Sequence, residues 1–136
     1  MKMGSALLAL AAAFACCPAA YAGHQYYDGE VSIYLPGRGA AGTLNVARRS
    51  ADPNAQIGCT IKYGVPTSTY PYPGLTQVYV TCVARNSQGR VDCISVDPAV
   101  IDIARTIVPT SFVAFSANES GLCVRLSVSN DSAYLP

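Results

Sequence analysis

Four cysteines, Cys59, Cys82, Cys93 and Cys123, constrain the fold of this chain more than any other feature of its sequence. Their intervals contain no C-x-x-C pair of the kind that zinc sites use, and His24 is the sole histidine. An even number of cysteines in a small exported domain typically forms disulfides. If the chain is exported, we therefore expect two disulfides, no metal site and no cofactor.

The first 22 residues have the pattern of a secretory signal peptide. Lys2 supplies the positive charge, an apolar run follows from Ala6 to Ala15, and Ala20-Tyr21-Ala22 places small residues before a cleavage point. An N-terminal membrane anchor is the alternative, but the run is too short to cross a hydrocarbon core of about 30 Å. We predict a signal peptide over 1–22 and a single disulfide-stabilised β domain over 23–136, secreted to the periplasm or the medium.

Cys16 and Cys17 raise a second alternative, a lipoprotein acylated at the cleavage point. The run Ala13-Phe14-Ala15-Cys16 matches that signal poorly, because the usual leucine is missing and Phe14 is bulky. We interpret both cysteines as part of the removed leader.

The charge balance argues against nucleic acid as a partner. Nine basic and eight acidic residues give a formal net charge of +1, and one basic residue, Lys2, lies in the leader. Nucleic-acid binding draws much of its affinity from the neutralisation of phosphates, which a neutral domain does not supply. Beyond the leader, no segment reaches the length of a membrane span.

Most of the remaining chain has the alternating, β-branched and aromatic pattern of short strands. The predicted strands are 30–34, 43–46, 57–63, 77–84, 91–96, 111–116 and 122–128. In 57–63, Ile57, Cys59, Ile61 and Tyr63 share one face, and in the last strand Leu122, Val124, Leu126 and Val128 share the apolar face. We predict a mainly β fold, a small antiparallel β-sandwich or barrel of about seven strands.

One segment has helical spacing instead. Apolar residues recur at intervals of three and four within 98–107, which predicts a short helix. Asp97 precedes it as an N-cap, Pro98 suits its first position and Pro109 ends it. Asp97 is therefore interpreted as a cap and not as a catalytic carboxylate.

The register of two hairpins bears on how the cysteines pair. A hairpin centred near Tyr70 sets Cys59 opposite Cys82, whereas the turn at 87–88 sets Cys82 opposite Cys93. The Cys59–Cys82 and Cys82–Cys93 disulfides cannot exist at once, because they share Cys82. A bulge at either turn would also shift the register. Cys59 and Cys82 are expected on strand faces that also carry Ile and Val, whereas Cys123 is expected on the polar face of its strand. This difference favours the pairing Cys59–Cys82 with Cys93–Cys123.

Catalytic groupings are absent from the sequence. His24, a natural base for a serine or cysteine nucleophile, sits next to the predicted new N-terminus. The acidic residues are scattered singly, mostly at turns or caps, and no phosphate-binding or calcium-loop motif occurs. Arg48-Arg49, the sole adjacent basic pair, is interpreted as part of a solvated loop. We predict that the protein is not an enzyme; a minimal hydrolase would need a cleft that the sequence does not reveal.

The loop 64–76 is the strongest candidate for a binding site. It contains Tyr70 and Tyr72 among three prolines and Gly74. Tyrosine offers a large, stiff contact surface with a hydroxyl group, and the prolines hold the loop extended, which lowers the ordering cost on binding. Packing over the edge of the core is the alternative role for these tyrosines.

Several runs together are similar to a known group of proteins. They are Gly58-Cys59, the segments 80–86 and 93–98, Phe115, Gly121-Leu122-Cys123 and the ending 128–134. The pattern resembles small secreted four-cysteine proteins of myxobacteria and related proteobacteria. The resemblance spans about residues 28–136 and implies a bacterial exported domain, with no implied activity or site.

These observations lead to two functional hypotheses. The first is an exported, non-catalytic binding or structural protein of the cell envelope or extracellular medium, whose partner is a protein or polysaccharide. The alternative is a secreted protease inhibitor with a disulfide-braced loop near Cys93, although the cysteine spacing departs from that of the subtilisin inhibitors.

Overall fold

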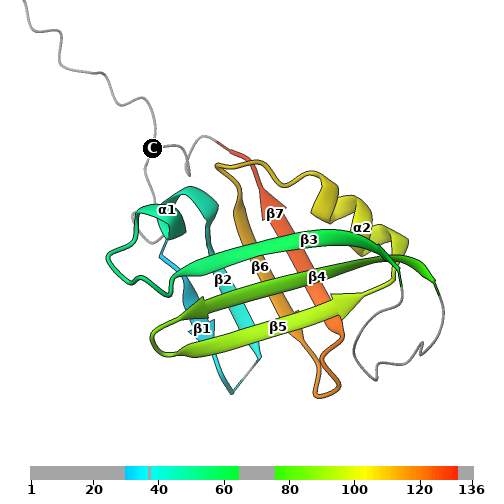
Figure 1. Cartoon of the computed structure of the whole chain (residues 1–136), viewed down its shortest axis with the longest axis horizontal. Helices are drawn as coiled ribbons and strands as arrows, with labels where there is room; N and C mark the ends of the chain where they lie inside the picture. The colour runs from blue at the N-terminus through cyan, green and yellow to red at the C-terminus, as the bar shows by residue number, and fades with distance from the viewer. Residues whose placement is uncertain (1–29, 37, 65–75, 132–136) are drawn as a thin grey trace, which may run out of the picture.

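The computed structural model describes residues 30–36, 38–64 and 76–131, and it confirms the predicted mainly β fold. Seven strands and two helices follow one another along the chain (Figure 1). Their bounds are β1 Ser32–Tyr34, β2 Gly39–Thr43, α1 Leu44–Arg49, β3 Gln56–Gly64, β4 Gln77–Asn86, β5 Gly89–Ser95, α2 Pro98–Arg105, β6 Phe112–Ala117 and β7 Cys123–Ser129.

The strands form two antiparallel sheets that pack as a sandwich. One sheet has the order β1-β2-β6-β7 and the other the order β3-β4-β5, and their strands cross steeply in Figure 1. A parallel bridge between Ile94 and Leu122 links β5 to the start of β7, where the Ile94 N–H donates to the Gly121 carbonyl at 2.9 Å. The two sheets are thus hydrogen-bonded to each other along one side.

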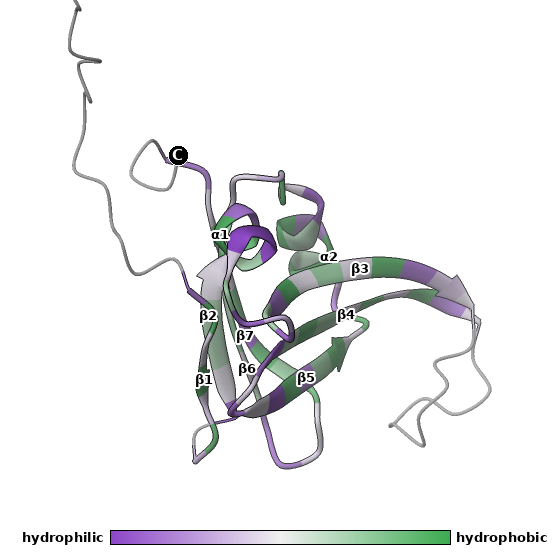
Figure 2. Cartoon of the chain, turned by 60° about the vertical axis from the view of Figure 1, so that its left-hand side comes forward, coloured by the Kyte–Doolittle hydropathy of each residue, from purple (hydrophilic) through white to green (hydrophobic). Residues whose placement is uncertain are grey.

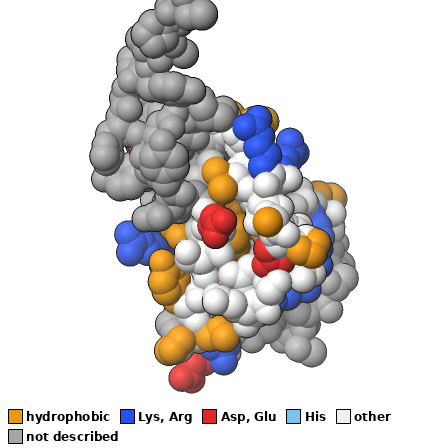
Figure 3. Space-filling model, turned by 90° about the vertical axis from the view of Figure 1, so that its left-hand side faces the viewer, with side chains coloured by type: hydrophobic (Ala, Val, Ile, Leu, Met, Phe, Trp, Pro, Cys, Tyr) orange, Lys and Arg blue, Asp and Glu red, His pale blue; other side chains and the backbone are white. Residues whose placement is uncertain are grey.

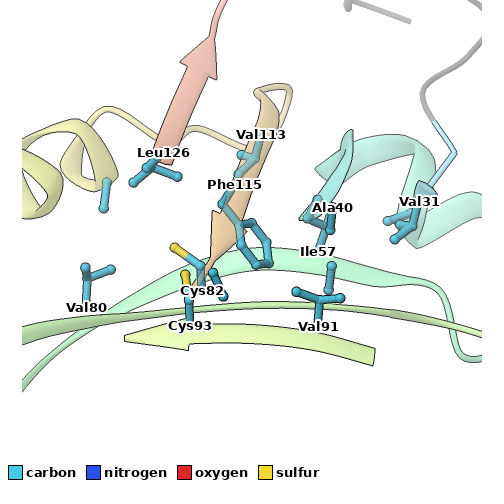
Figure 4. Close-up of a cluster of buried hydrophobic side chains, with 14 of the residues drawn as sticks. Val31, Ala40, Ile57, Val80, Cys82, Val91, Cys93, Val113, Phe115 and Leu126 are labelled. Atoms are coloured by element: carbon cyan, nitrogen blue, oxygen red, sulfur yellow. The ribbon is translucent and has the colours of Figure 1, made fainter. Parts of the chain in front are cut away.

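The core lies between the sheets and under the helices. Val113, Phe115 and Leu126 extend from the four-stranded sheet towards Val80 and Cys82 of the three-stranded sheet (Figure 4). Both helices lie along one open side of the sandwich, beyond β3, and bury Ala47, Ile101 and Ala104. This apolar layer supplies the main favourable term in folding.

The register of the three-stranded sheet agrees with the sequence prediction. Tyr63 lies opposite Val78 and Cys59 opposite Cys82, while the two-residue turn at 87–88 sets Cys82 opposite Cys93. The prediction of the helix is also confirmed, with bounds Pro98–Arg105. The Asp97 carboxylate caps it by accepting from the Ala99 N–H at 2.8 Å.

The prediction of a strand over 43–46 is wrong. The strand here is β2, which runs from Gly39 to Thr43, and the next six residues form α1, a second helix. Because α1 includes Arg48-Arg49, the prediction of a loop at this basic pair is also wrong. Small residues in β2 allow close packing, because a Cβ on Gly42 would lie 3.1 Å from the Val31 Cα. The close approach of β1 to β2 therefore requires a glycine at position 42.

The predicted inner face of the last strand is also wrong at one position. The register of β6 and β7 shifts, so that Ala117 pairs with Cys123 but Ser116 pairs with Arg125. The extra residue, Val124, is 63% exposed, and Cys123 packs against the core in its place. A β-bulge adds one residue to a strand and so reverses which neighbour faces inward.

Candidate functional site

The end of the β3–β4 hairpin carries three exposed apolar side chains, which we call the hairpin-end surface: Ile61, Tyr63 and Val78. Their exposed fractions are 37%, 76% and 38%. Tyr63 and Val78 are directly opposite each other in the ladder, and Ile61 lies two residues before Tyr63 on the same face of the strand. The three side chains therefore form one cross-strand group.

The hairpin-end surface is a continuation of the core-facing side of the sheet. Along β3 the same face carries Ile57, which is 6% exposed, and then Ile61 and Tyr63. Along β4 exposure rises likewise from 0% at Val80 to 38% at Val78. Figure 2 shows the reason, because the end of the hairpin extends beyond the other sheet, which no longer covers this face. An apolar sheet face thus emerges from the sandwich into solvent.

The surroundings of this surface are nearly free of charge. Within β3 and β4 the charged side chains are Lys62 and Arg85, and Arg85 lies opposite Gln56 at the far end of the ladder. In addition, β3 forms an edge of its sheet, because β4 is its strand neighbour in the order β3-β4-β5. The hairpin end therefore combines apolar side chains with the backbone groups of an edge strand.

The opposite end of the molecule has a different surface. Figure 3 views that end, where hydrophobic side chains stand in small separate groups between acidic, basic and other residues. Scattered exposed apolar residues of this kind are normal on soluble proteins, whereas a contiguous group is more often functional. This contrast singles out the hairpin-end surface.

Sequence reasoning located part of this candidate site. It set Ile61 and Tyr63 on one face of their strand, but it did not predict that the face would be exposed. The feature that could have indicated the exposure of these side chains is strand length. β3 has 9 residues and β4 has 10, whereas β6 in the other sheet has 6. The predicted binding residues Tyr70 and Tyr72 lie outside the described residues, in the loop that this hairpin carries.

One disulfide lies within the three-stranded sheet, and the other joins this sheet to the four-stranded sheet. Cys59–Cys82 links β3 to β4, and Cys93–Cys123 links β5 to β7. This is the pairing that the sequence favoured, although one premise fails, because Cys123 packs against the core and not on a polar face. All four sulfur atoms are in disulfides, so none is a thiolate that could act as nucleophile or metal ligand.

The segment that the inhibitor alternative requires is a strand in this structure. Residues 89–95 form β5, in which Cys93 and Ser95 are 2% and 8% exposed. An inhibitory loop would instead present its backbone to a protease in an exposed, extended form. No structural observation on the described residues favours the inhibitor alternative.

Three of the described carboxylates engage in contacts within their own segment. Asp92 pairs with Arg90, Asp102 pairs with Arg105, and Asp97 caps α2. Contacts of this kind are typical of structural carboxylates at the surface of a protein.

Asp52 has the most extensive set of contacts among the acids. Its carboxylate accepts from the Ser87 N–H at 2.6 Å, the Ser87 hydroxyl at 2.8 Å and the Asn54 N–H at 2.8 Å, which ties the loop after α1 to the β4–β5 turn. The backbone hydrogen bond from Asn54, with those from Ser87, lowers the pKa of Asp52 below its ordinary value.

The lowered pKa of Asp52 predicts a pH-dependent contribution to stability. The ionised group favours the folded state above the unfolded pKa of about 3.9, and this contribution is lost as the pH falls through the lower folded pKa. Asp52→Asn should therefore be less stable than the wild type near about pH 6, and the gap should close by about pH 2. Urea unfolding of both proteins across this range measures the gap, and a constant difference would contradict the assignment.

Within the described residues, no helix has the length and apolar character needed to span a membrane. Comparison of the chain with protein-family models, with curated protein sequences and with solved structures gives no match.

Proposed function

We propose that this chain is an exported, non-catalytic binding protein of the cell envelope or extracellular medium, which holds a partner through the hairpin-end surface. The observation that carries this proposal is the exposed cross-strand group of Ile61, Tyr63 and Val78 at the end of one hairpin. The loop 64–76, with Tyr70 and Tyr72, follows β3 in the sequence and remains part of the proposed binding site.

The chemistry of the surface favours a protein as the partner. Interface centres are depleted in charge and enriched in aromatic residues, and Tyr63 lies among apolar side chains with Lys62 as its one charged neighbour on β3. The edge position of β3 also suits an extended peptide segment, which can add to a sheet by backbone hydrogen bonds. Polysaccharide sites more often use tryptophan as a stacking platform, and the sequence contains none.

Export is supported by two independent features. The two disulfides suit an oxidising compartment, and the leader pattern over 1–22 directs a chain there. The resemblance to small secreted four-cysteine proteins of myxobacteria and related proteobacteria agrees with this proposal and adds no activity to it.

Substitution of the hairpin-end surface should weaken partner capture without unfolding the protein. The oxidised exported chain is immobilised, exposed to envelope and medium fractions, and retained molecules are identified by mass. Tyr63→Ser and Val78→Thr each remove apolar contact area that solvent already reaches, so melting temperatures should change little. Affinity for the retained partner should fall roughly tenfold or more, as truncation of a central interface residue does.

Val124→Thr is the matched control, because it makes the same change as Val78→Thr at a valine that is 63% exposed on β7. It should leave capture unchanged. Tyr70→Ala and Tyr72→Ala then test whether the loop adds affinity. Equal capture by wild type and Tyr63→Ser would contradict the proposal, and a retained polysaccharide would contradict the choice of a protein partner.

A further inference from the structure

The two disulfides lie in contact distance of each other inside the core. The sulfur atoms of Cys82, Cys93 and Cys123 all lie within 4.8 Å of one another. Figure 4 shows the Cys82 and Cys93 side chains, from adjacent strands, with their sulfur atoms side by side. A thiolate at Cys82 would need only a small side-chain rotation to reach the neighbouring disulfide.

We propose that the four cysteines form a relay, in which a single disulfide can move across the sheet by thiol–disulfide exchange after the other has been reduced. The three positions of the moving bond are Cys59–Cys82, Cys82–Cys93 and Cys93–Cys123. The external reactant is a dithiol, and the relay conveys its two electrons from one side of the domain to the other. This activity is separate from partner binding at the hairpin-end surface.

The exchange balances in atoms and electrons. One sulfur of the dithiol attacks Cys59, and Cys82 leaves as a thiolate; the second dithiol sulfur then releases the Cys59 thiol and departs as a disulfide. The Cys82 thiolate attacks the Cys93 sulfur, forming Cys82–Cys93 and breaking Cys93–Cys123. Cys123 leaves as a thiolate and takes up a proton from solvent. The Cys59 thiolate then attacks the Cys82 sulfur, which re-forms Cys59–Cys82 and releases Cys93 as a thiolate, so that Cys93 and Cys123 hold the two electrons.

The middle position of the relay is compatible with the existing register. Cys59 and Cys82 are directly opposite with a Cα–Cα distance of 4.0 Å, which marks a pair without hydrogen bonds between its two members. The backbone groups of Cys82 therefore face β5, so Cys82 and Cys93 form a hydrogen-bonded pair, whose Cα atoms are typically about 5.5 Å apart. That separation lies within the usual disulfide range of about 4.4–6.8 Å.

Burial divides the four cysteines into two roles. Cys82 and Cys93 are 0% and 2% exposed, so an external dithiol has no access to them. Cys59 and Cys123 are half-buried and lie at the two ends of the row. The outer pair thus meets the dithiol, and the inner pair passes the bond through the core.

The test uses the chain with Cys59→Ser, which leaves Cys82 as a free thiol beside the intact Cys93–Cys123 disulfide. After incubation at about pH 8, where thiolates form, the sample is quenched in acid, its free thiols are alkylated, and peptides are mapped by mass. We expect two isomers, one labelled at Cys82 and the other labelled at Cys123 with a Cys82–Cys93 bond. Their ratio should lie within about tenfold of unity and be independent of protein concentration.

The double variant Cys59→Ser/Cys82→Ser is the matched control, because it lacks the internal nucleophile and should show no label on Cys123. Label confined to Cys82 in a folded Cys59→Ser sample would overturn the relay. If circular dichroism shows that Cys59→Ser does not fold, limiting dithiothreitol is applied to the wild type and the one-disulfide species are mapped. There the relay predicts a species with Cys82–Cys93 and label on both outer cysteines, and its absence would overturn the proposal.

Discussion

Replacing Cys93 and Cys123 together by alanine is expected to lower the free energy of unfolding by about 3–4 kcal/mol. The disulfide closes a sequence separation of 30 residues, so its loss frees conformational entropy in the unfolded chain. A loss of this size is a large part of the stability of a small domain. Urea unfolding monitored by circular dichroism, with the slope compared between variants, measures the change.

Cys59→Ala with Cys82→Ala is the matched control, because it removes a disulfide of similar sequence separation, 23 residues, that lies within one sheet. The two variants should lose similar stability but differ in hydrogen exchange. The Ile94 N–H, bonded to the Gly121 carbonyl between the sheets, should exchange faster when Cys93–Cys123 is removed. A loss below about 1 kcal/mol in the Cys93/Cys123 variant would contradict the expectation that this disulfide stabilises the fold by joining the two sheets.

Phe115→Ala is expected to cost about 3–5 kcal/mol of unfolding free energy. Phe115 is 3% exposed, and its ring points from β6 towards the other sheet, between Cys82 and Ile57 (Figure 4). Truncation removes the transfer free energy of the ring and leaves a cavity that this small core can fill only in part. Urea unfolding at constant slope measures the cost.

Phe115→Leu serves as the control, since it keeps most of the apolar volume and should cost clearly less than alanine. Equal losses for leucine and alanine would point to a specific role of the ring. A loss under about 1 kcal/mol for alanine would contradict the position of Phe115 at the centre of the core.

The three-stranded sheet could be predicted from the sequence because local rules determine it. The two-residue turn at Ser87-Gln88 and the alternation along 77–84 fix one register, and the symmetry about Tyr70 fixes the other. The cap at Asp97 is equally local. These features depend on residues close together in the chain, so the local sequence was sufficient to predict them.

The errors arose where distant segments decide the structure. Glycine is typical of loops, and the place of Gly42 in a strand depends on its close packing against Val31. Alternation predicts that the Val124 side chain faces inward, but the bulge at Cys123 shifts the register and exposes it. Both depend on partners that sequence periodicity does not reveal.

The candidate site shows the same division. Alternation set Ile61 and Tyr63 on the core-facing side, which is their position in the ladder. Their exposure depends on how far the opposite sheet extends, a property of the assembled sandwich. The sulfur cluster is likewise visible only after β7 brings Cys123 beside β5.

Both the binding surface and the relay require that this chain is exported and oxidised. Mass analysis of the protein recovered from the envelope and medium of producing cells tests this requirement. We expect a chain beginning at Gly23 that is four hydrogens lighter than its reduced form, with peptides linked as Cys59–Cys82 and Cys93–Cys123. A chain that retains residues 1–22 inside the cell, with four free thiols, would contradict it.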